Sequence, residues 1–371
     1  MFRRPAVAFR DSGVTLVNVS VEVTERQLGE LIRRCYLGHS ASELREDVLR
    51  RLRSIVPVDA AFFATVDPAT LLFTSALAEE PLGSVTPLFL DNEYGQSDVN
   101  KFTILADRTD PVGSLDGATK GDRHSSLRYQ DVIAPLGLGD ELRAALIGRG
   151  RCWGVLCLHR GASCFGFSER EIAIVRRLAP HFAEGLRRSM VIDGTSRPPD
   201  AAGPGIVVLD DNLSLLSMNP EAEGWIDEMQ ESTRSPGAEL PMALYAAAAH
   251  LKGVEAAPEG QPTSVRLQTN AGRWLILHAS HLYGSAGRQT AIVLEPASSD
   301  EMSSLILDAH GLTPAQNRVA VLVLRGFSTQ AIVNELHISA HTVQEHLSAI
   351  FDKFGVGSRR ELVNSLLGGP H

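Results

Sequence analysis

The last sixty residues of the chain, 312–371, contain four groups of helix-capping side chains in close succession, and these constrain the fold more than any other feature. Each group stands before apolar residues at helical spacing: Thr313 with Pro314 and Gln316, Ser328, Ser339, and Ser358 with Glu361. Gly326 ends the first predicted helix, and only a few residues separate the second helix, which ends near Leu336, from the third. Two helices joined by such a short turn form a helix-turn-helix. The segment therefore predicts an all-α module of four helices.

The predicted third helix has one apolar face and one polar face. The apolar residues recur at helical spacing and form one buried stripe: Val343, Leu347, Ile350 and Phe354. The opposite face carries His341, Gln344, Glu345, Ser348 and Asp352. Glutamine pairs with adenine in the major groove of DNA, and glutamate accepts a hydrogen bond from the cytosine amino group. This face indicates base recognition, although a four-helix module for protein contacts would show the same periodicity.

The segment from Leu312 to Leu366 resembles the LuxR-type DNA-binding domain. That family's pattern runs LTPRE, GLSNKEIA, LSPxTVKxHL and KLGVxSRxEL, and this chain reads LTPAQ, GFSTQAI, ISAHTVQEHL and KFGVGSRREL at the same places. With the polar helix face and the cations at the helix ends, the resemblance implies a set of DNA-contacting residues: Thr329, Ser339, His341, Thr342, Gln344, Glu345, His346, Ser348, Lys353, Arg359 and Arg360. Lys353, Arg359 and Arg360 are expected to grip phosphate. Gln344 departs from the family pattern, which has lysine there.

The charge of this segment is nearly balanced. Its cations are Arg318, Arg325, Lys353, Arg359 and Arg360, and its anions are Glu335, Glu345, Asp352 and Glu361, which leaves 5 − 4 = +1. This is a weak electrostatic footprint for a DNA binder. We therefore expect a homodimer that reads two half-sites about ten base pairs apart. The same balance keeps open an alternative, a regulator that acts through protein contacts and no longer contacts DNA.

The whole chain has the length and composition of a multidomain globular protein. Its 371 residues predict two or three domains. The formal charge of −9 argues against a broad surface for nucleic acid or membrane. No apolar run approaches the roughly 18 residues that span a bilayer, and the apolar stretch near the N-terminus is too short for a signal peptide. Four cysteines form no disulfide framework, so we expect a cytoplasmic protein without a membrane partner.

Two breaks in composition divide the chain into three predicted domains. A proline- and glycine-rich stretch over 193–204 reads as a linker, and a shorter break covers 295–300. The resulting domains are 24–192, 204–297 and 303–371.

The first domain shows two hairpins and a long final helix. The hairpins turn at 67–70 and 148–151, and Ser168 with Glu171 caps the helix. The apolar stripe of this helix comprises Ile172, Val175, Leu178, Phe182 and Leu186. This α+β order resembles a GAF domain, which implies a sensor and dimerisation domain. The stripe either forms a dimer seam, together with Leu362, Val363 and Leu366 of the last helix, or covers its own sheet.

The second domain begins with a strand, a polar turn, a second strand and a helix capped at Asn219, which resembles the start of a PAS domain. Strands near 263–268, 273–279 and 289–294 would complete a five-stranded antiparallel sheet. A phosphoryl-receiver domain also starts with an acidic turn like that at Asp210 and Asp211, but it needs a later apolar strand that ends in aspartate. Residues 253–260 offer neither, so this alternative is disfavoured.

Side chains with reactive chemistry form no catalytic or metal-binding pattern. Cys152, Cys157 and Cys164 lack a CxxC pair, and the first two are expected on opposite faces of one strand as core residues. Cys164, in a predicted loop, is the one candidate thiol sensor. We predict no enzyme activity, no metal and no cofactor. Either α+β domain can enclose a small-molecule ligand or be a filled core that serves dimerisation.

These features predict an α+β multidomain chain with a C-terminal all-α helix-turn-helix domain. Its expected function is that of a sequence-specific DNA-binding transcriptional regulator, in which the N-terminal sensory domains modulate the binding of double-stranded operator DNA. RNA polymerase is a further candidate partner. The second linker is short, so we expect coupling through the relative orientation of the domains.

Overall fold

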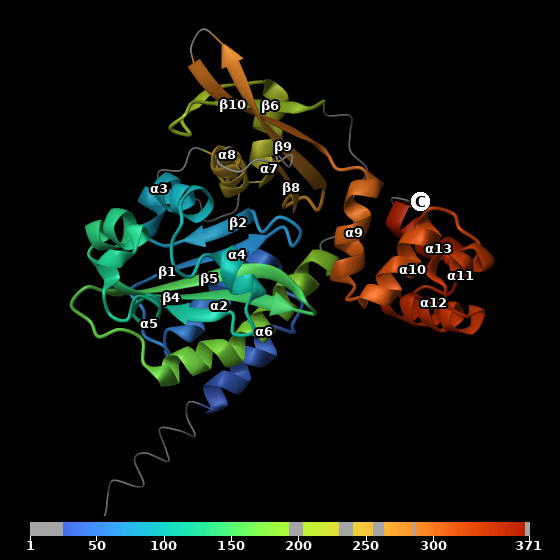
Figure 1. The fold of residues 1–371 in the computed structure, drawn as a ribbon, viewed down its shortest axis with the longest axis horizontal. Helices are drawn as coiled ribbons and strands as arrows, with labels where there is room; N and C mark the ends of the chain where they lie inside the picture. The colour runs from blue at the N-terminus through green and yellow to red at the C-terminus, as the bar shows by residue number, and fades with distance from the viewer. Residues whose placement is uncertain (1–24, 193–202, 230–239, 255–262, 285–286, 368–371) are drawn as a thin grey trace, which may run out of the picture.

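The structure is a computed structural model that describes residues 25–192, 203–229, 240–254, 263–284 and 287–367 (Figure 1). The predicted linker over 193–204 lies almost entirely outside these residues. None of the described helices is long and apolar enough to cross a membrane.

The first domain is a five-stranded antiparallel sheet of order β2-β1-β5-β4-β3 between two helical layers. Its principal elements are a helix over 25–34, α2 (Ala41–Leu52), β1 (Ala60–Val66), β2 (Phe73–Ala78), α3 (Thr86–Leu90), η2 (Asp91–Gly95), α4 (Phe102–Asp107), β3 (Val112–Ser114), α5 (Leu115–Thr119), η4 (Tyr129–Ile133), β4 (Leu138–Gly148), β5 (Arg151–Gly161) and α6 (Glu169–Ile192). Both predicted hairpins are present, and Ser168 caps α6 as expected, with Glu171 closing the capping box.

The apolar stripe of α6 is covered within the chain. Its five residues, Ile172, Val175, Leu178, Phe182 and Leu186, are at most 7% exposed and pack in one core with Phe63 and Leu146 of the sheet. Leu362 and Leu366 of the last helix are buried as well, and Val363 is half-buried against the same core. The predicted dimer seam through these residues is therefore wrong, and the alternative, in which the stripe covers its own sheet, describes the structure.

The two strand cysteines also depart from expectation. Cys152 and Cys157 are five residues apart in β5, which would place them on opposite faces of a regular strand. A bulge opposite Leu146 and Ile147 shifts the register, and both thiols lie in the same core cluster. The prediction of opposite faces is thus wrong, whereas the prediction of core packing is confirmed. Burial raises the pKa of both thiols to about 12. Cys164 is exposed, as predicted.

The second domain contains another five-stranded antiparallel sheet, of order β7-β6-β10-β9-β8. Its elements are β6 (Gly205–Leu209), β7 (Leu215–Met218), α7 (Pro220–Met229), α8 (Met242–Val254), β8 (Thr263–Gln268), β9 (Trp274–Gly284) and β10 (Gly287–Pro296). Counted along each domain, the strand order is the same in both sheets. Asn219 caps α7 as predicted, by accepting from the backbone N–H of Ala222 at 3.0 Å. The antiparallel sheet agrees with rejection of a receiver domain; the PAS assignment stays a prediction.

Helix α8, which the sequence analysis did not anticipate, lies between the two sheets (Figure 1). Its residues from Ala243 to Ala249 are all buried, because β2, α3 and η2 of the first domain pack on one side and β8 and β9 of the second on the other. Phe73 and Leu277, from the two sheets, consequently belong to one continuous core. Gly253 is required at this contact, since a Cβ there would collide with the carbonyl of Tyr94. The two predicted domains thus share one core.

The C-terminal part is entirely helical, and every predicted cap is present. Its helices are α9 (Ser299–Ala309), α10 (Pro314–Leu324), α11 (Thr329–Leu336), α12 (Ala340–Phe354) and α13 (Arg359–Leu367). Thr313, Ser328 and Ser339 cap α10, α11 and α12. Ser358 accepts from the N–H of Glu361, whose own carboxylate accepts from the Ser358 hydroxyl and from the backbone N–H of Gly357.

Helix α9 connects the two sheet domains to the last four helices. Its N-cap Ser298 follows β10 after a single intervening residue. Met302, Leu305 and Ala309 pack in the core of the first sheet, whereas Leu307 packs in the core of the last four helices. The connection between the two parts is therefore a docked helix.

Candidate functional site

The α11–turn–α12 corner presents one face of α12 to solvent. The turn is tight because His337 takes left-handed backbone angles (φ 56°) and Ser339 immediately caps α12 through the N–H of Thr342, at 3.0 Å. Val343, Leu347 and Ile350 are at most 5% exposed and fix the inner face of α12 against the core. This buried stripe therefore determines which face of α12 points to solvent.

The polar residues predicted to address bases lie together on the outer face. His341, Gln344, Glu345 and Ser348 are all exposed, and the His341 ring lies 3.5 Å from the Glu345 carboxylate. We call these four residues the α12 strip. Of the remaining predicted residues of this region, Thr329, Thr342 and His346 are half-buried. Ser339 is exposed, and its hydroxyl contacts that of Thr342 at 2.9 Å.

The three predicted phosphate contacts are not equivalent in the structure. The Lys353 ammonium donates to the carbonyl of Gly311 and to Oε1 of Gln316, both at 2.7 Å, and burial lowers its pKa, with a smaller contribution from nearby arginines. The Arg359 guanidinium donates to the carbonyl of Phe327. Arg360 is exposed. Two of the three cations are thus held by the protein's own backbone, and Arg360 is the most accessible.

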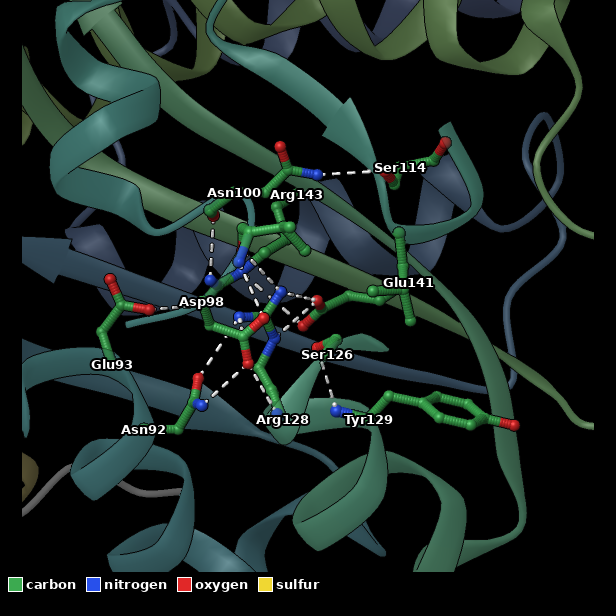
Figure 2. A network of polar contacts seen from close by, with 12 residues as sticks. Asn92, Glu93, Asp98, Asn100, Ser114, Ser126, Arg128, Tyr129, Glu141 and Arg143 are labelled. Carbon is green, nitrogen blue, oxygen red and sulfur yellow. Dashed lines mark hydrogen bonds and ion pairs between the residues drawn. The ribbon is translucent and has the colours of Figure 1, made fainter. Parts of the chain in front are cut away.

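A second polar cluster, which the sequence analysis missed, fills the space between β4 and the segments that cover it (Figure 2). Arg128 is 1% exposed and donates through Nε to Glu141 Oε2 at 2.9 Å and through Nη2 to the carbonyl of Val99 at 3.1 Å. Its backbone N–H donates to Asp98 at 2.6 Å. Ion pairing offsets the cost of burying these charges.

Arg143, in the same strand as Glu141, is completely buried and extends this network. Its guanidinium donates to Glu93 at 2.8 Å and to the carbonyl of Asn100 at 3.0 Å, and it stacks 3.9 Å from the centre of the Phe102 ring. The network therefore ties η2 and α4 to the sheet.

Glu141, Cys157 and His159 bring possible metal-ligand atoms within 4.8 Å of one another. Burial lowers the pKa of His159 to about 4, so its ring is neutral. Burial would raise the pKa of Glu141, but Arg128 and Arg143 outweigh it and hold the carboxylate ionised. With two guanidinium groups already on that carboxylate, the cluster is unsuited to a cation. Sequence periodicity gave no signal for this cluster, because it is the β4–β5 register that sets Glu141 opposite His159 and Arg143 opposite Cys157.

Comparisons with known proteins agree with this architecture. Residues 310–366 match the luxR family of bacterial regulatory proteins, and residues 40–186 match the GAF domain. The chain is 32% identical over 90 residues to the probable HTH-type transcriptional regulator GfsR of Streptomyces halstedii, covering 24% of this chain and 37% of that protein. It is 40% identical over 52 residues to the transcriptional regulatory protein ComA of Bacillus subtilis (strain 168), covering 14% and 24%. The chain thus spans little more than a third of the first relative and a quarter of the second.

Among solved structures, a Vibrio cholera VqmA–ligand–DNA complex is 19% identical and covers 46% of this chain and 86% of that one, with a TM-score of 0.24. A likeness this distant says nothing about the present fold. The family matches and the geometry agree independently of it: an antiparallel sheet domain stands at 40–186 and a helix-turn-helix at 310–366. The chain combines a GAF domain in its N-terminal half with a C-terminal DNA-binding domain of the luxR family of bacterial regulatory proteins.

Proposed function

We propose that the chain is a sequence-specific transcriptional regulator in which α12 enters the major groove of operator DNA. The α12 strip carries this proposal, because it gathers exposed donors and acceptors on one face of a helix whose other face is fixed in the core. Thr329, Ser339, Thr342 and His346 would contact the flanking backbone, and Arg360 would contact phosphate. A cytoplasmic location, with RNA polymerase as a further partner, belongs to the same proposal.

The test is the double change Gln344→Ala with Glu345→Ala in the full chain. Both side chains are exposed, so the circular-dichroism spectrum should stay unchanged while a gel shift on a promoter fragment found by genomic footprinting is lost. Asn364→Ala with Ser365→Ala provides a control that also removes two adjacent exposed polar side chains, on α13. Survival of the gel shift in the Gln344/Glu345 variant would show that α12 does not read the operator.

A homodimer is part of the proposal, since one small helical module with a balance of +1 offers few phosphate contacts. Two copies on half-sites about ten base pairs apart would add the specificity that one lacks. Sedimentation of the protein on an operator fragment should give two chains per duplex. A single chain bound to a single half-site would contradict the dimer.

We further propose that 24–192 and 204–297 act together as the sensor and 303–371 as the DNA-binding domain. Their shared core around α8 and the double docking of α9 support this division. A change in the sensor would reach DNA through the position of α9.

A second candidate function is a regulator that acts through protein contacts alone. The engagement of Lys353 and Arg359 within the protein favours it, because fewer cations remain for phosphate. The dependence of duplex binding on salt separates the two functions, since only phosphate contact releases counterions. The absence of duplex binding, or duplex binding that does not change with salt concentration, would support the second candidate.

A further inference from the structure

A cleft of about 680 Å³ lies where the sensor part meets the DNA-binding part. The turn between β4 and β5 forms one side, with Arg149 and Arg151. Helix α9 forms the second side, and α10 and α11 form the third. The volume is that of sites for small organic ligands. Any occupant of this cleft contacts both the sensor and the DNA-binding domain.

The wall on the DNA-binding side is apolar. Its apolar surface comes from Leu312, Pro314, Val321, Leu322 and Leu336, with Asn317, Arg318 and Glu335 beside it. Leu322 belongs to the core of the C-terminal helices, so its position is fixed. This wall favours a ligand with a hydrocarbon or aromatic body.

The polar groups of the cleft carry an excess of positive charge. Three arginines line it, Arg149, Arg151 and Arg318, against the two carboxylates Asp308 and Glu335. Asp308 is already engaged, because it lies 3.1 Å from Arg151 Nε and accepts from Asn317 Nδ2 at 3.2 Å. Arg318 is exposed and has no ion-pair partner among the described residues. An anionic group therefore finds a guanidinium without displacing an existing pair.

One buried polar atom in the cleft lining lacks a partner. The side-chain carbonyl oxygen of Asn317 is buried and accepts no hydrogen bond in the described part of the chain. Such an atom costs free energy unless a donor reaches it. Because this oxygen is closed off from solvent, an N–H or O–H group of a ligand pairs with it once the Asn317 side chain turns into the cleft.

We propose that this cleft binds a small amphipathic organic anion, with its acid group at Arg318, its apolar body on the wall of Leu312, Val321 and Leu336, and a donor at Asn317. Binding itself is independent of the proposed function; its regulatory consequence rests on that function. By contacting both parts at once, the ligand favours one orientation of the DNA-binding domain over others.

Anilinonaphthalene sulfonate is a suitable probe, because it joins a sulfonate, an N–H donor and aromatic rings. Fluorescence titration of the full chain should show saturable binding. Arg318→Glu should weaken it about fivefold or more, the scale of one partly screened ion pair. Arg325→Glu, the same charge change at an exposed position of the same domain outside the cleft, should leave the affinity unchanged. Decanoate should displace the probe, and its uncharged methyl ester should not.

Val321→Trp gives a second, charge-independent variant, since it narrows the cleft from a half-buried position. It should reduce probe binding while the circular-dichroism spectrum is retained. Wild-type affinity in both Arg318→Glu and Val321→Trp would place the probe elsewhere and overturn the proposal, as would the absence of saturable binding. A gel shift on the same preparations keeps the two proposals apart: DNA binding without probe binding contradicts the cleft alone, and probe binding without DNA binding contradicts the proposed function alone.

Discussion

Arg266 and Asp67 are 199 residues apart in the chain and form a bidentate ion pair. Nη2 and Nε of the arginine donate to the two carboxylate oxygens at 2.7 and 3.0 Å, and Asp67 is only 1% exposed. The same guanidinium donates through Nη1 to Ser304 Oγ at 2.8 Å. One side chain of β8 therefore joins the turn of the first hairpin to α9, the helix that leads to the DNA-binding domain.

Loss of this ion pair should destabilise the chain strongly. Asp67→Asn leaves the buried guanidinium without its counterion, so we expect the free energy of unfolding to fall by about 3–5 kcal/mol. As a control, Asp211→Asn breaks the more exposed ion pair between Asp211 and Arg288 of the second domain. This change should lower the free energy of unfolding by about 1 kcal/mol or less. Urea unfolding of both variants measures the difference. Equally small losses of unfolding free energy in the two variants would show that Asp67 does not stabilise the buried Arg266 side chain.

Arg360 and Lys353 should respond differently to removal. Arg360→Ala in a DNA-bound dimer eliminates two phosphate contacts, so the slope of log K against log salt concentration should fall by about 2. Lys353→Met should leave this slope unchanged, because its ammonium is bonded to Gly311 and Gln316, and should instead lower the free energy of unfolding by about 1–2 kcal/mol. Titrations on one operator at several salt concentrations measure both slopes. A reduced slope in Lys353→Met would assign that lysine to phosphate after all.

His159 should make the sensor sensitive to acid. Its pKa is about 4 in the folded chain against an ordinary value of 6.5, so between these values the unfolded chain binds the extra proton. The resulting loss of folding stability is absent above pH 6.5, grows as the pH falls towards 4, and is constant below pH 4. From pH 7 to pH 5 the wild type should lose about 2 kcal/mol more stability than His159→Gln. Urea unfolding at both pH values checks this; equal losses would mean that the folded chain accepts the proton.

The helix-turn-helix was predictable from sequence because its determinants are local. A cap such as Ser339 acts on an N–H three residues away, and the stripe of Val343, Leu347 and Ile350 lies within one helix. The α12 strip followed directly from that stripe. The engagement of Lys353 did not, since its acceptors at Gly311 and Gln316 are more than thirty residues away.

Helix α8 and the network of Arg128 and Arg143 were missed for related reasons. Helix α8 is buried between two sheets and carries small apolar side chains, mainly alanines, all around its circumference. No single apolar stripe therefore distinguishes it in the sequence. The network depends on pairing across the β4–β5 hairpin, whose register sets Glu141 opposite His159 and Arg143 opposite Cys157. The periodicity of the sequence shows neither the second sheet that covers α8 nor the register of the β4–β5 hairpin.

The point at which the chain can be uncoupled follows from the docking of α9. An insertion of about ten Gly/Ser residues after Pro296 lies before α9, whose residues Met302 and Leu305 still hold it in the sensor core. We therefore expect that insertion to change operator affinity little. The same insertion after Gly311, in the turn between α9 and α10, replaces a short connection with a flexible one, so that α9 no longer fixes the orientation of the DNA-binding domain. Its operator affinity should then approach that of a 312–371 fragment. Fluorescence anisotropy on one labelled operator compares the four proteins. If the insertion after Pro296 had the larger effect, the short break before α9, and not its docking, would transmit the signal.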